Sequence, residues 1–384
     1  MSEVAYRPRL VFWELTKGCN LRCVHCRATA TDLSSPDDLS YDESVQIIDQ
    51  LAAYAPLILV LSGGEPLFRR DVFRLARRAT DRGIRVALGT NGTLITADVA
   101  REICESGIRR VAISLDGPDA ATHDAFRGIP GAFHKALEGF DHLKRLGMSL
   151  QINTSVAKHN SAKLPETLDL ALRLGADAFH LFLLVPVGCG VQIADKQMVE
   201  AEEYEQILNW LYDRTVENQI ELKATCAPHF FRVVRQRRAE ARRRGEVLPE
   251  PTAHGHGGHA PSAMNIMTRG CLAGTGVCFI SHQGGVYPCG YLPLEAGNLR
   301  RQSFAQVWGS SSLFESLRDL ENLKGKCGVC EFRNICEGCR ARAFGCTGDY
   351  LAEEPFCLYT PRQVPLPAVL PREQAPVLLR DTPS

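Results

Sequence analysis

The sequence has no excess of charge of either sign and no long apolar run. Its 44 lysine and arginine residues balance 44 aspartate and glutamate residues, and the pI is about 7.1. Such a chain lacks the long-range field that attracts nucleic acid or an anionic membrane, so we expect neither as a partner. No stretch is apolar for long enough to span a bilayer, and residues 1–8 are polar. We therefore expect a soluble, cytoplasmic protein.

Cysteine, in contrast, is abundant, with 15 among 384 residues. In a cytosolic chain this number favours metal or redox chemistry over disulfides. The hydrophobic content of 45% is enough for sizeable cores, and the length suggests two or three units. From the changes in composition we predict a first unit at 1–200, a bridging region at 201–263, a cysteine-rich domain at 264–360 and a proline-rich tail at 361–384.

Three cysteines lie close together after an apolar run at residues 10–16. Cys19, Cys23 and Cys26 are separated by three and then by two residues. Thiolates this close can hold three irons of a [4Fe–4S] cube and leave the fourth iron open to a small chelating molecule. A zinc site is the alternative, but zinc usually takes four protein ligands at paired spacings, and no fourth ligand is near in sequence.

Strand-like and helix-like segments alternate from residue 10 to about residue 185. Apolar runs indicate strands at 10–16, 57–62, 85–90, 110–116, 150–156 and 179–185. Amphipathic stretches separate them, and the first begins at a predicted capping box, Ser40-Tyr-Asp-Glu43. The alternation predicts an α/β fold with a parallel sheet and right-handed crossovers. Six such units close only part of an eight-stranded barrel, so we expect a partial (β/α)6 barrel.

Polar residues and glycines follow several of these strands. In barrels of this kind ligands gather at the carboxyl ends of the strands, and glycines permit close approach of the backbone. Each position alone is weak evidence, because a Gly-Gly after a strand is usually a turn; their order after a three-cysteine loop is stronger evidence. The positions are Gly63, Gly64, Glu65, Pro66, Asn91, Ser114, Asp116 and Asn153.

The bridging region begins with a predicted helix at 201–218 and a short strand at 221–225. Cys226 and His229 follow, and they either contact a metal in the substrate or form a buried thiol and a structural histidine. Seven arginines lie from Arg232 to Arg244. They are predicted either to form a solvated face of a helix or to bind carboxylates of the substrate. Residues 249–260 are rich in glycine, histidine and proline and predict a mobile loop, whose histidines at 254, 256 and 259 are further candidate ligands.

A second set of cysteines lies in the last third of the chain, where glycines and short turns replace the β/α rhythm. Its members are Cys271, Cys278, Cys289, Cys327, Cys330, Cys336, Cys339 and Cys357. Paired spacings of this kind occur in iron–sulfur sites and in zinc ribbons. Cys104, Cys189 and Cys346 fit neither pattern and are expected to be ordinary thiols. The proline-rich tail is expected to pack poorly.

The three-cysteine loop resembles the signature of the radical S-adenosylmethionine (SAM) enzymes, in which SAM binds the open iron. His25 stands where that family usually has an aromatic ring, and an imidazole can fill the same flat site. The resemblance implies the partial barrel, a [4Fe–4S] cluster and SAM. It also implies that residues 63–66 meet the methionine amine and that Arg127 pairs with the SAM carboxylate. Asn91, Ser114, Asp116 and Asn153 would line the ribose and methionine.

The second cysteine set resembles the SPASM extension of radical SAM enzymes, which holds auxiliary iron–sulfur clusters. The resemblance implies one [4Fe–4S] cluster on Cys271, Cys278, Cys289 and Cys339. It implies another on Cys327, Cys330, Cys336 and Cys357. Two residues separate Cys336 from Cys339, where the family commonly has three. The ligand partition, and whether one or two auxiliary clusters form, therefore stays open.

Longer segments resemble the haem b synthases of the siroheme-dependent haem pathway. These segments are 24–27, 179–186, 223–229, 268–278 and 282–291. The resemblance implies oxidative decarboxylation of two propionates of iron-coproporphyrin III to vinyl groups, with a flavodoxin or ferredoxin as low-potential electron donor. The alternatives are another tetrapyrrole step of the haem-d1 type, a peptide-modifying enzyme and a non-catalytic electron carrier.

Overall fold

One sheet of ten strands organises the computed structural model, which describes residues 6–29, 35–217, 219–246 and 270–362. Its strand order is β10-β9-β8-β1-β2-β3-β4-β5-β6-β7. The six strands predicted from the apolar runs are confirmed as parallel neighbours. They are β1 Leu10–Glu14, β2 Ile58–Ser62, β3 Arg85–Thr90, β4 Arg110–Ser114, β5 Ser149–Val156 and β6 Ala178–Leu183.

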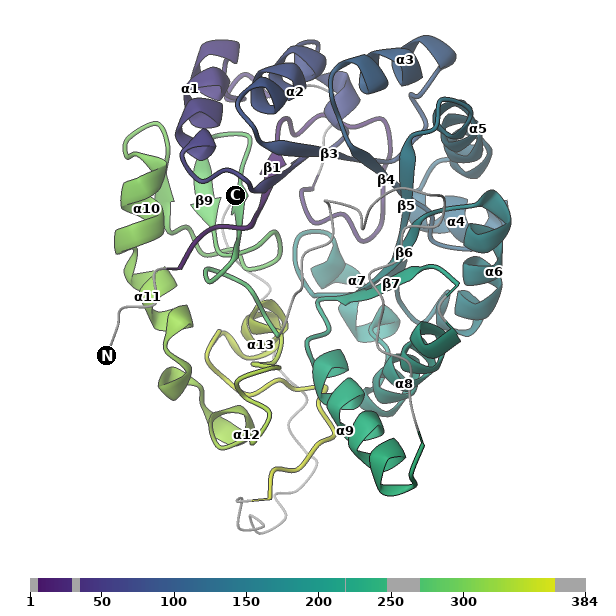
Figure 1. Ribbon diagram of the computed structural model, residues 1–384, viewed down its shortest axis with the longest axis vertical. Helices are drawn as coiled ribbons and strands as arrows, with labels where there is room; N and C mark the ends of the chain where they lie inside the picture. The colour runs from purple at the N-terminus through teal and green to yellow at the C-terminus, as the bar shows by residue number, and fades with distance from the viewer. Residues whose placement is uncertain (1–5, 30–34, 218, 247–269, 363–384) are drawn as a thin grey trace.

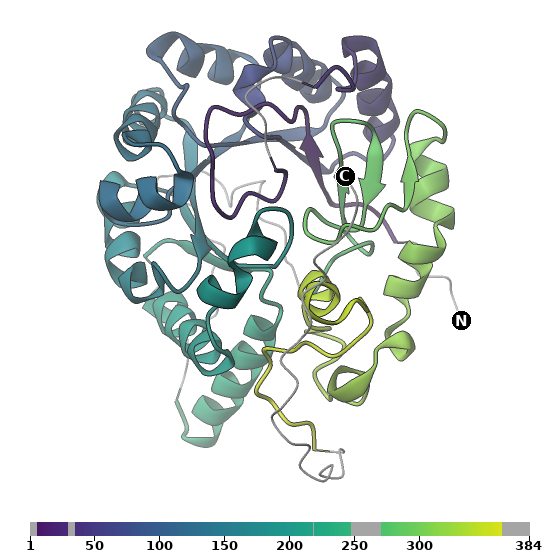
Figure 2. The ribbon, with the colours of Figure 1, turned by 180° about the vertical axis from the view of Figure 1, so that it is seen from behind.

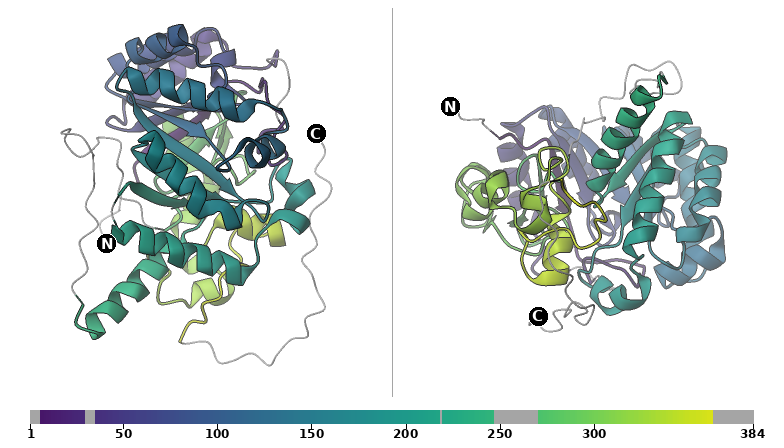
Figure 3. Two further views of the ribbon diagram at one scale, coloured as in Figure 1. Left: turned by 90° about the vertical axis from the view of Figure 1, so that its right-hand side faces the viewer. Right: turned by 90° about the horizontal axis from the view of Figure 1, so that it is seen from below.

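Helices cover the outer face of these strands (Figures 1 and 3). They are α1 Tyr41–Ala52, α2 Val72–Asp81, α3 Ala97–Glu105, α4 Ala120–Arg127, α5 Ala132–Arg145 and α6 Leu164–Leu174, with short 3-10 turns η1 Pro66–Phe68 and η2 Ser161–Lys163. α7 Gly190–Gln197 instead lies over the opening of the barrel, beside the loop that follows β1 (Figure 2). The predicted capping box starts α1: the Glu43 amide donates to Ser40 Oγ, and the Ser40 amide donates to Glu43 Oε2.

The sheet continues beyond the six predicted units at both edges. β7 Glu221–Thr225, which follows α8 Ala201–Glu217, pairs in parallel with β6. β8 Val277–Ile280 pairs in parallel with β1, and β9 Gly285–Tyr287 and β10 Gly297–Asn298 follow as antiparallel neighbours. The division of the chain near residues 200 and 264 stays a prediction, and the sheet crosses both positions.

Side chains alternate between two faces along each strand, as the pleat requires. One face packs against the helices in the main apolar core, for example Val11 of β1, Leu59 of β2 and Ile152 of β5, all fully buried. The other face points into the partial barrel and carries polar residues on β5, where Gln151 and Asn153 are half-buried. The interior of the partial barrel is therefore polar at this strand.

The C-terminal part lies at the open side of the partial barrel (Figures 1 and 2). Its helices are α10 Phe304–Ser310, α11 Ser312–Arg318, α12 Gly325–Gly328 and α13 Arg340–Thr347, with the 3-10 turn η3 Leu320–Asn322. α9 His229–Arg243 lies beyond β7. Arg342 of α13 is fully buried and donates to the carbonyls of Leu183 and Leu184 at the end of β6, at 3.2 and 3.3 Å. None of the helices in the described ranges has the length and apolarity needed to cross a membrane.

Candidate functional site: a three-cysteine loop and two groups of cysteines

The three-cysteine loop connects β1 to α1 and is held by backbone hydrogen bonds. The Cys26 amide donates to the Cys23 carbonyl at 3.1 Å, and the Cys189 amide donates to the Cys26 carbonyl at 2.8 Å. Burial raises the pKa of Cys19 to about 12, and the nearby charges of Glu65, Cys23 and Cys26 add to the effect. Thiolates this close together repel one another, and the irons of a cluster would compensate their charge, so this donor set fits an iron cluster.

The Gly63-Gly64-Glu65 turn packs directly on the backbone that leads into Cys19. The Gly64 amide donates to the Thr16 carbonyl at 2.8 Å, and the Glu65 amide donates to the Gly18 carbonyl at 2.7 Å. A Cβ atom on Gly64 would lie 2.4 Å from the Gly18 carbonyl oxygen. The glycines are therefore needed for close approach of two loops.

The Glu65 carboxylate is buried and already has three protein donors. It accepts from the Leu67 amide at 3.2 Å, from Thr90 Oγ1 at 2.8 Å and from the Asn91 amide at 2.8 Å. Burial raises its pKa to about 7, against the opposing effect of these hydrogen bonds. Asn91, held in this way, donates from Nδ2 to Asn20 Oδ1 at 2.9 Å and reaches Cys19 Sγ at 3.9 Å. Glu65 thus positions the ends of η1 and β3 beside the cysteine loop.

Arg127 and Asp116 form a buried ion pair on the other side of the loop. Arg127 Nε lies 2.6 Å from Asp116 Oδ2, and Arg127 Nη1 lies 3.6 Å from Cys23 Sγ. Asp116 Oδ1 also accepts from the Ser155 amide at 2.8 Å. Asp116 therefore fixes the guanidinium while Arg127 keeps one nitrogen directed at a cysteine of the loop.

A stack of three rings covers the same region. His25 stacks on Phe126 with ring centroids 3.9 Å apart, and Phe126 stacks on His159 at 4.0 Å. His25 thus lies flat against an aromatic ring, as its predicted place in a flat site requires. Burial lowers the pKa of His25 to about 3, so its ring is neutral. His159 was missed, because nothing in the spacing of the sequence separates it from other loop histidines.

Ser114 and Asn153 lie side by side on neighbouring strands, further along the sheet from the cysteine loop. They are register partners on β4 and β5, and both are half-buried. Asn153 Oδ1 accepts from Gln151 Nε2 at 2.7 Å, and Gln151 Nε2 lies 2.9 Å from His180 Nδ1. These residues form a polar row in the interior of the partial barrel.

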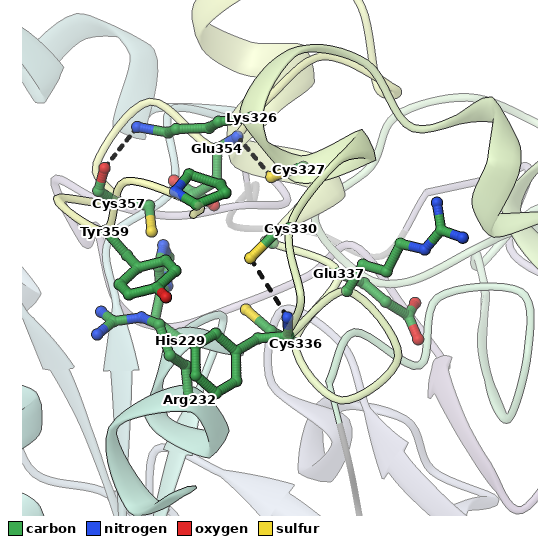
Figure 4. A pocket seen from close by; sticks show the side chains of 14 residues that line it. His229, Arg232, Lys326, Cys327, Cys330, Cys336, Glu337, Glu354, Cys357 and Tyr359 are labelled. Atoms are coloured by element: carbon green, nitrogen blue, oxygen red, sulfur yellow. Dashed lines mark hydrogen bonds between the residues drawn. The ribbon is translucent and has the colours of Figure 1, made fainter. Parts of the chain in front are cut away.

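Four of the C-terminal cysteines line one pocket (Figure 4). They are Cys327, Cys330, Cys336 and Cys357. The pocket encloses about 370 Å³ between protein atoms, part of it open to solvent. His229 and Arg232 line it from α9, and both are nearly fully buried. The structure thus brings together the four cysteines that were predicted as one set, and it adds His229 to their surroundings.

The other predicted set does not come together as a whole. Burial, followed by the charges of Cys339 and Cys289, raises the pKa of Cys271 to about 12. Cys226 and Cys289 both pack on the small apolar cluster that contains Cys339, and the neighbouring Cys226 thiol lowers the pKa of Cys339 to about 7. Cys278 lies on β8 in the main core, where burial alone raises its pKa. Cys271, Cys289 and Cys339 are therefore neighbours, with Cys226 beside them and Cys278 apart.

Comparison with known proteins identifies the family. Residues 13–171 match the model of the radical SAM superfamily, and residues 271–340 match SPASM, an iron–sulfur cluster-binding domain. A protein from Methanosarcina barkeri named AdoMet-dependent heme synthase is 49% identical over 361 residues, which are 94% of this chain and 99% of that protein. A protein of the same name from Nitratidesulfovibrio vulgaris is 46% identical, covering 93% and 94%. The chain belongs to the radical SAM family, with a SPASM domain.

Solved structures support the fold of this radical SAM protein. Streptococcus suis SuiB bound to S-adenosylmethionine has a TM-score of 0.68 at 17% identity, covering 92% of this chain and 78% of that one. The enzyme anSMEcpe with bound AdoMet has a TM-score of 0.62 at 19% identity, covering 87% and 90%. The predicted fold class, an α/β radical SAM barrel with a cysteine-rich SPASM domain, is confirmed.

The cofactors of this radical SAM protein are SAM and iron–sulfur clusters, and its cysteine groups fit them. Within the described ranges, no three His, Cys, Asp or Glu side chains converge closely enough for a single metal ion. A four-iron cube takes its thiolates at separate corners, one from each ligating cysteine. Three thiols fit the open-iron cluster, and four thiols around one pocket fit an auxiliary cluster.

Arg27 was missed by the sequence analysis, although its place next to Cys26 was an available signal. Arg27 Nη2 lies 2.8 Å from Glu14 Oε1, and its guanidinium carbon lies 4.2 Å from the centroid of the Phe279 ring. Its charge also acts against the rise in the pKa of Cys289 that burial causes. Arg27 therefore connects the cysteine loop with the SPASM domain.

The arginine run divides between the two predicted roles. Arg232 lines the four-cysteine pocket, whereas Arg235 and the arginines at 242–244 are exposed, as a solvated face requires. The predicted mobile loop at 249–260, with its three histidines, lies outside the described residues.

Proposed function

We propose that this protein converts two propionate side chains of iron-coproporphyrin III into vinyl groups and so forms haem b. The observation that carries the proposal is the 49% identity, over nearly the full length of both chains, to a protein named AdoMet-dependent heme synthase. A Dinoroseobacter shibae protein named Pre-heme d1 synthase and a Mycolicibacterium smegmatis protein named Mycofactocin maturase MftC are each 32% identical. These lower values favour haem b formation over the haem-d1 and peptide-modifying alternatives.

The residues around the three-cysteine loop would bind the cofactors. Cys19, Cys23 and Cys26 would hold the cluster, which with bound SAM supplies a 5′-deoxyadenosyl radical. Because the Glu65 carboxylate already accepts three protein hydrogen bonds, we assign the methionine amine to backbone carbonyls of the Gly63–Glu65 turn rather than to that carboxylate. Arg127, fixed by Asp116, offers its remaining donors to the SAM carboxylate.

The interior of the partial barrel supplies a cation for a substrate carboxylate. Lys223 of β7 lies opposite His180 of β6 in the parallel register. The next residue of β7, Ala224, is buried in the core on the opposite face of the sheet. Lys223 therefore points into the barrel. Burial lowers the pKa of Lys223, and the charge of Glu221 opposes this effect. A propionate bound beside it would likewise favour the charged ammonium.

Each proposed conversion removes a hydrogen atom, carbon dioxide and one further electron from the substrate. A propionate minus these three is a vinyl group, so atoms and charge balance. The substrate must therefore lie where a hydrogen on its side chain meets the SAM site and where an electron can leave. We propose a flavodoxin or ferredoxin as the electron donor for SAM cleavage.

Anaerobic incubation of the reconstituted protein with SAM, reductant and iron-coproporphyrin III tests the proposal. We expect mass spectrometry to show two successive losses, each of carbon dioxide and two hydrogens from one propionic acid side chain. We also expect 5′-deoxyadenosine as a product. Formation of 5′-deoxyadenosine without any decarboxylated porphyrin would contradict the proposed substrate while leaving the radical SAM assignment intact. The same assay with the precursor of haem d1 would test the second tetrapyrrole class.

A further inference from the structure

Cys278 lies on the wrong face of its strand to join the other cysteines. β8 pairs with β1 so that Cys278 lies opposite Val11, and Phe279 lies opposite Phe12. Val11 is fully buried in the core between the sheet and the helices, and Cys278, also fully buried, belongs to the same core. Its side chain therefore points away from the interior of the partial barrel and packs as a small apolar residue.

Cys226 lies where a fourth thiol is needed. It directly follows β7, the strand at the edge of the sheet next to β6. Cys226 and Cys289 both pack on the small apolar cluster that contains Cys339. Cys226 therefore comes from the barrel yet makes its contacts with cysteines of the SPASM domain.

The backbone of Cys226 is held in a conformation that L residues rarely adopt. Its φ is +58°, and only Thr29 and Glu337 share a positive φ among the described non-glycine residues. The Tyr204 hydroxyl donates to the Cys226 carbonyl at 3.1 Å and helps to fix this conformation. Strained backbone persists where the surrounding structure requires a particular direction for a side chain, and here Cys226 packs against the apolar cluster that contains Cys339.

The surroundings also suit a negatively charged cluster. Arg342, three residues after Cys339, is fully buried and donates to the Tyr204 hydroxyl, which in turn donates to the Cys226 carbonyl, so a positive charge lies close to both cysteines. The apolar side chains that pack around these cysteines include Val185, Leu292 and Ala341, which exclude water. Thiolates in a dry site need both a cluster and nearby positive charge to be stable.

We propose that Cys226, Cys271, Cys289 and Cys339 are the four thiolate ligands of one auxiliary [4Fe–4S] cluster and that Cys278 is a residue of the hydrophobic core. The barrel then contributes a ligand to a cluster of the SPASM domain. Such a cluster would join the two parts covalently through iron at the carboxyl end of β7, the edge at which ligands gather in barrels of this type.

The test compares Cys226 and Cys278 in a background that lacks the open-iron cluster. With Cys19, Cys23 and Cys26 all replaced by Ala, two auxiliary clusters of four irons give about eight irons per chain. In this background we expect Cys226→Ala to lose iron and to change the electron paramagnetic resonance spectrum of one reduced cluster. Cys278→Val, which preserves an apolar side chain of similar size, is expected to keep the iron content and the spectrum of the background.

Cys226→Ser separates ligation from folding, because it nearly preserves the volume of the side chain. A serine oxygen in place of the ligating sulfur should shift the spectrum of one cluster even if four irons remain. Unchanged iron and unchanged spectra in both Cys226 variants would overturn the proposal. Loss of iron in Cys278→Val, with circular dichroism matching that of the background, would overturn it as well.

Discussion

At the scale of single residues, the three thiols of the loop at Cys19, Cys23 and Cys26 act as one unit, because each would hold a different iron of the same cluster. Replacing any one of them by Ala leaves two thiolate ligands, which are too few to bind three irons of the cluster. We expect each variant to lose reductive cleavage of SAM, measured as 5′-deoxyadenosine by chromatography. Cys104→Ala is the matched control, since Cys104 is a half-buried thiol on α3. Normal 5′-deoxyadenosine formation by any of these loop variants would show that the replaced cysteine is not a required ligand of the cluster.

Lys223 is the residue whose charge bears most directly on the proposed substrate. Lys223→Met removes the cation but keeps much of the side-chain volume, so we expect weaker binding of iron-coproporphyrin III, by roughly tenfold for one lost charged contact of about 1.5 kcal/mol. Binding is measured by optical titration, and SAM cleavage without porphyrin should stay at the wild-type rate. Lys223→Arg should recover part of the affinity, and Lys135→Met on the exposed face of α5 should have no effect. If Lys223→Met bound iron-coproporphyrin III with wild-type affinity, Lys223 would not be a contact of the substrate.

At the scale of elements, the contact between the turn after β2 and the cysteine loop depends on the absence of a side chain at Gly64. Gly64→Ala would place a Cβ atom 2.4 Å from the Gly18 carbonyl oxygen and 2.6 Å from that of Lys17, both backbone atoms that cannot move independently of the loop. We expect lower iron occupancy of the loop and slower SAM cleavage. Gly309→Ala is the control, because a Cβ there meets no atom within 4 Å and alanine favours the helix by about 0.5–1 kcal/mol. Equal iron occupancy in the two variants would contradict the steric argument.

The elements also show how far the sequence could be interpreted. Most of the strands β1 to β6 were predicted from short apolar runs, whereas β5 alternates apolar and polar residues; both patterns are local, as is the capping box at Ser40. The pairing of β8 with β1 joins residues more than 260 positions apart, and no local pattern specifies it. That register decides which face Cys278 occupies, so the resemblance to SPASM assigned Cys278 to a set of cysteines that the structure does not bring together. From the sequence, Cys226 was identified only as a thiol near His229, and nothing there indicated that Cys226 lies beside the cysteines of the SPASM domain.

At the scale of the whole molecule, the barrel and the SPASM domain are joined by one sheet and by hydrogen bonds of Arg342, which is itself held by a buried ion pair within the C-terminal part. Arg342 and Glu354 are both fully buried, with Arg342 Nη1 3.5 Å from Glu354 Oε2. Arg342 also donates to the Tyr204 hydroxyl at 3.2 Å and to two carbonyls after β6, whereas Glu354 accepts from the Cys339 amide at 2.8 Å. This network connects the end of β6, helix α8 and a cysteine of the auxiliary site. It therefore couples the stability of the domain contact to the position of that cysteine.

Breaking this ion pair should be costly, because it leaves a buried charge without its partner. We expect Arg342→Met to cost roughly 3–5 kcal/mol and to lower the anaerobic Tm, followed by circular dichroism, by roughly 5 °C. The double variant Arg342→Met with Glu354→Gln removes both charges and should recover part of the loss. The exposed pair Arg301–Glu295, with Arg301 77% exposed, gives the control: Arg301→Met should shift Tm by about 1 °C or less. If Arg342→Met and Arg301→Met lowered Tm equally, the buried pair would not stabilise the contact. If the double variant were no more stable than Arg342→Met, the loss would come from the unsatisfied carbonyls after β6 rather than from the unpaired Glu354.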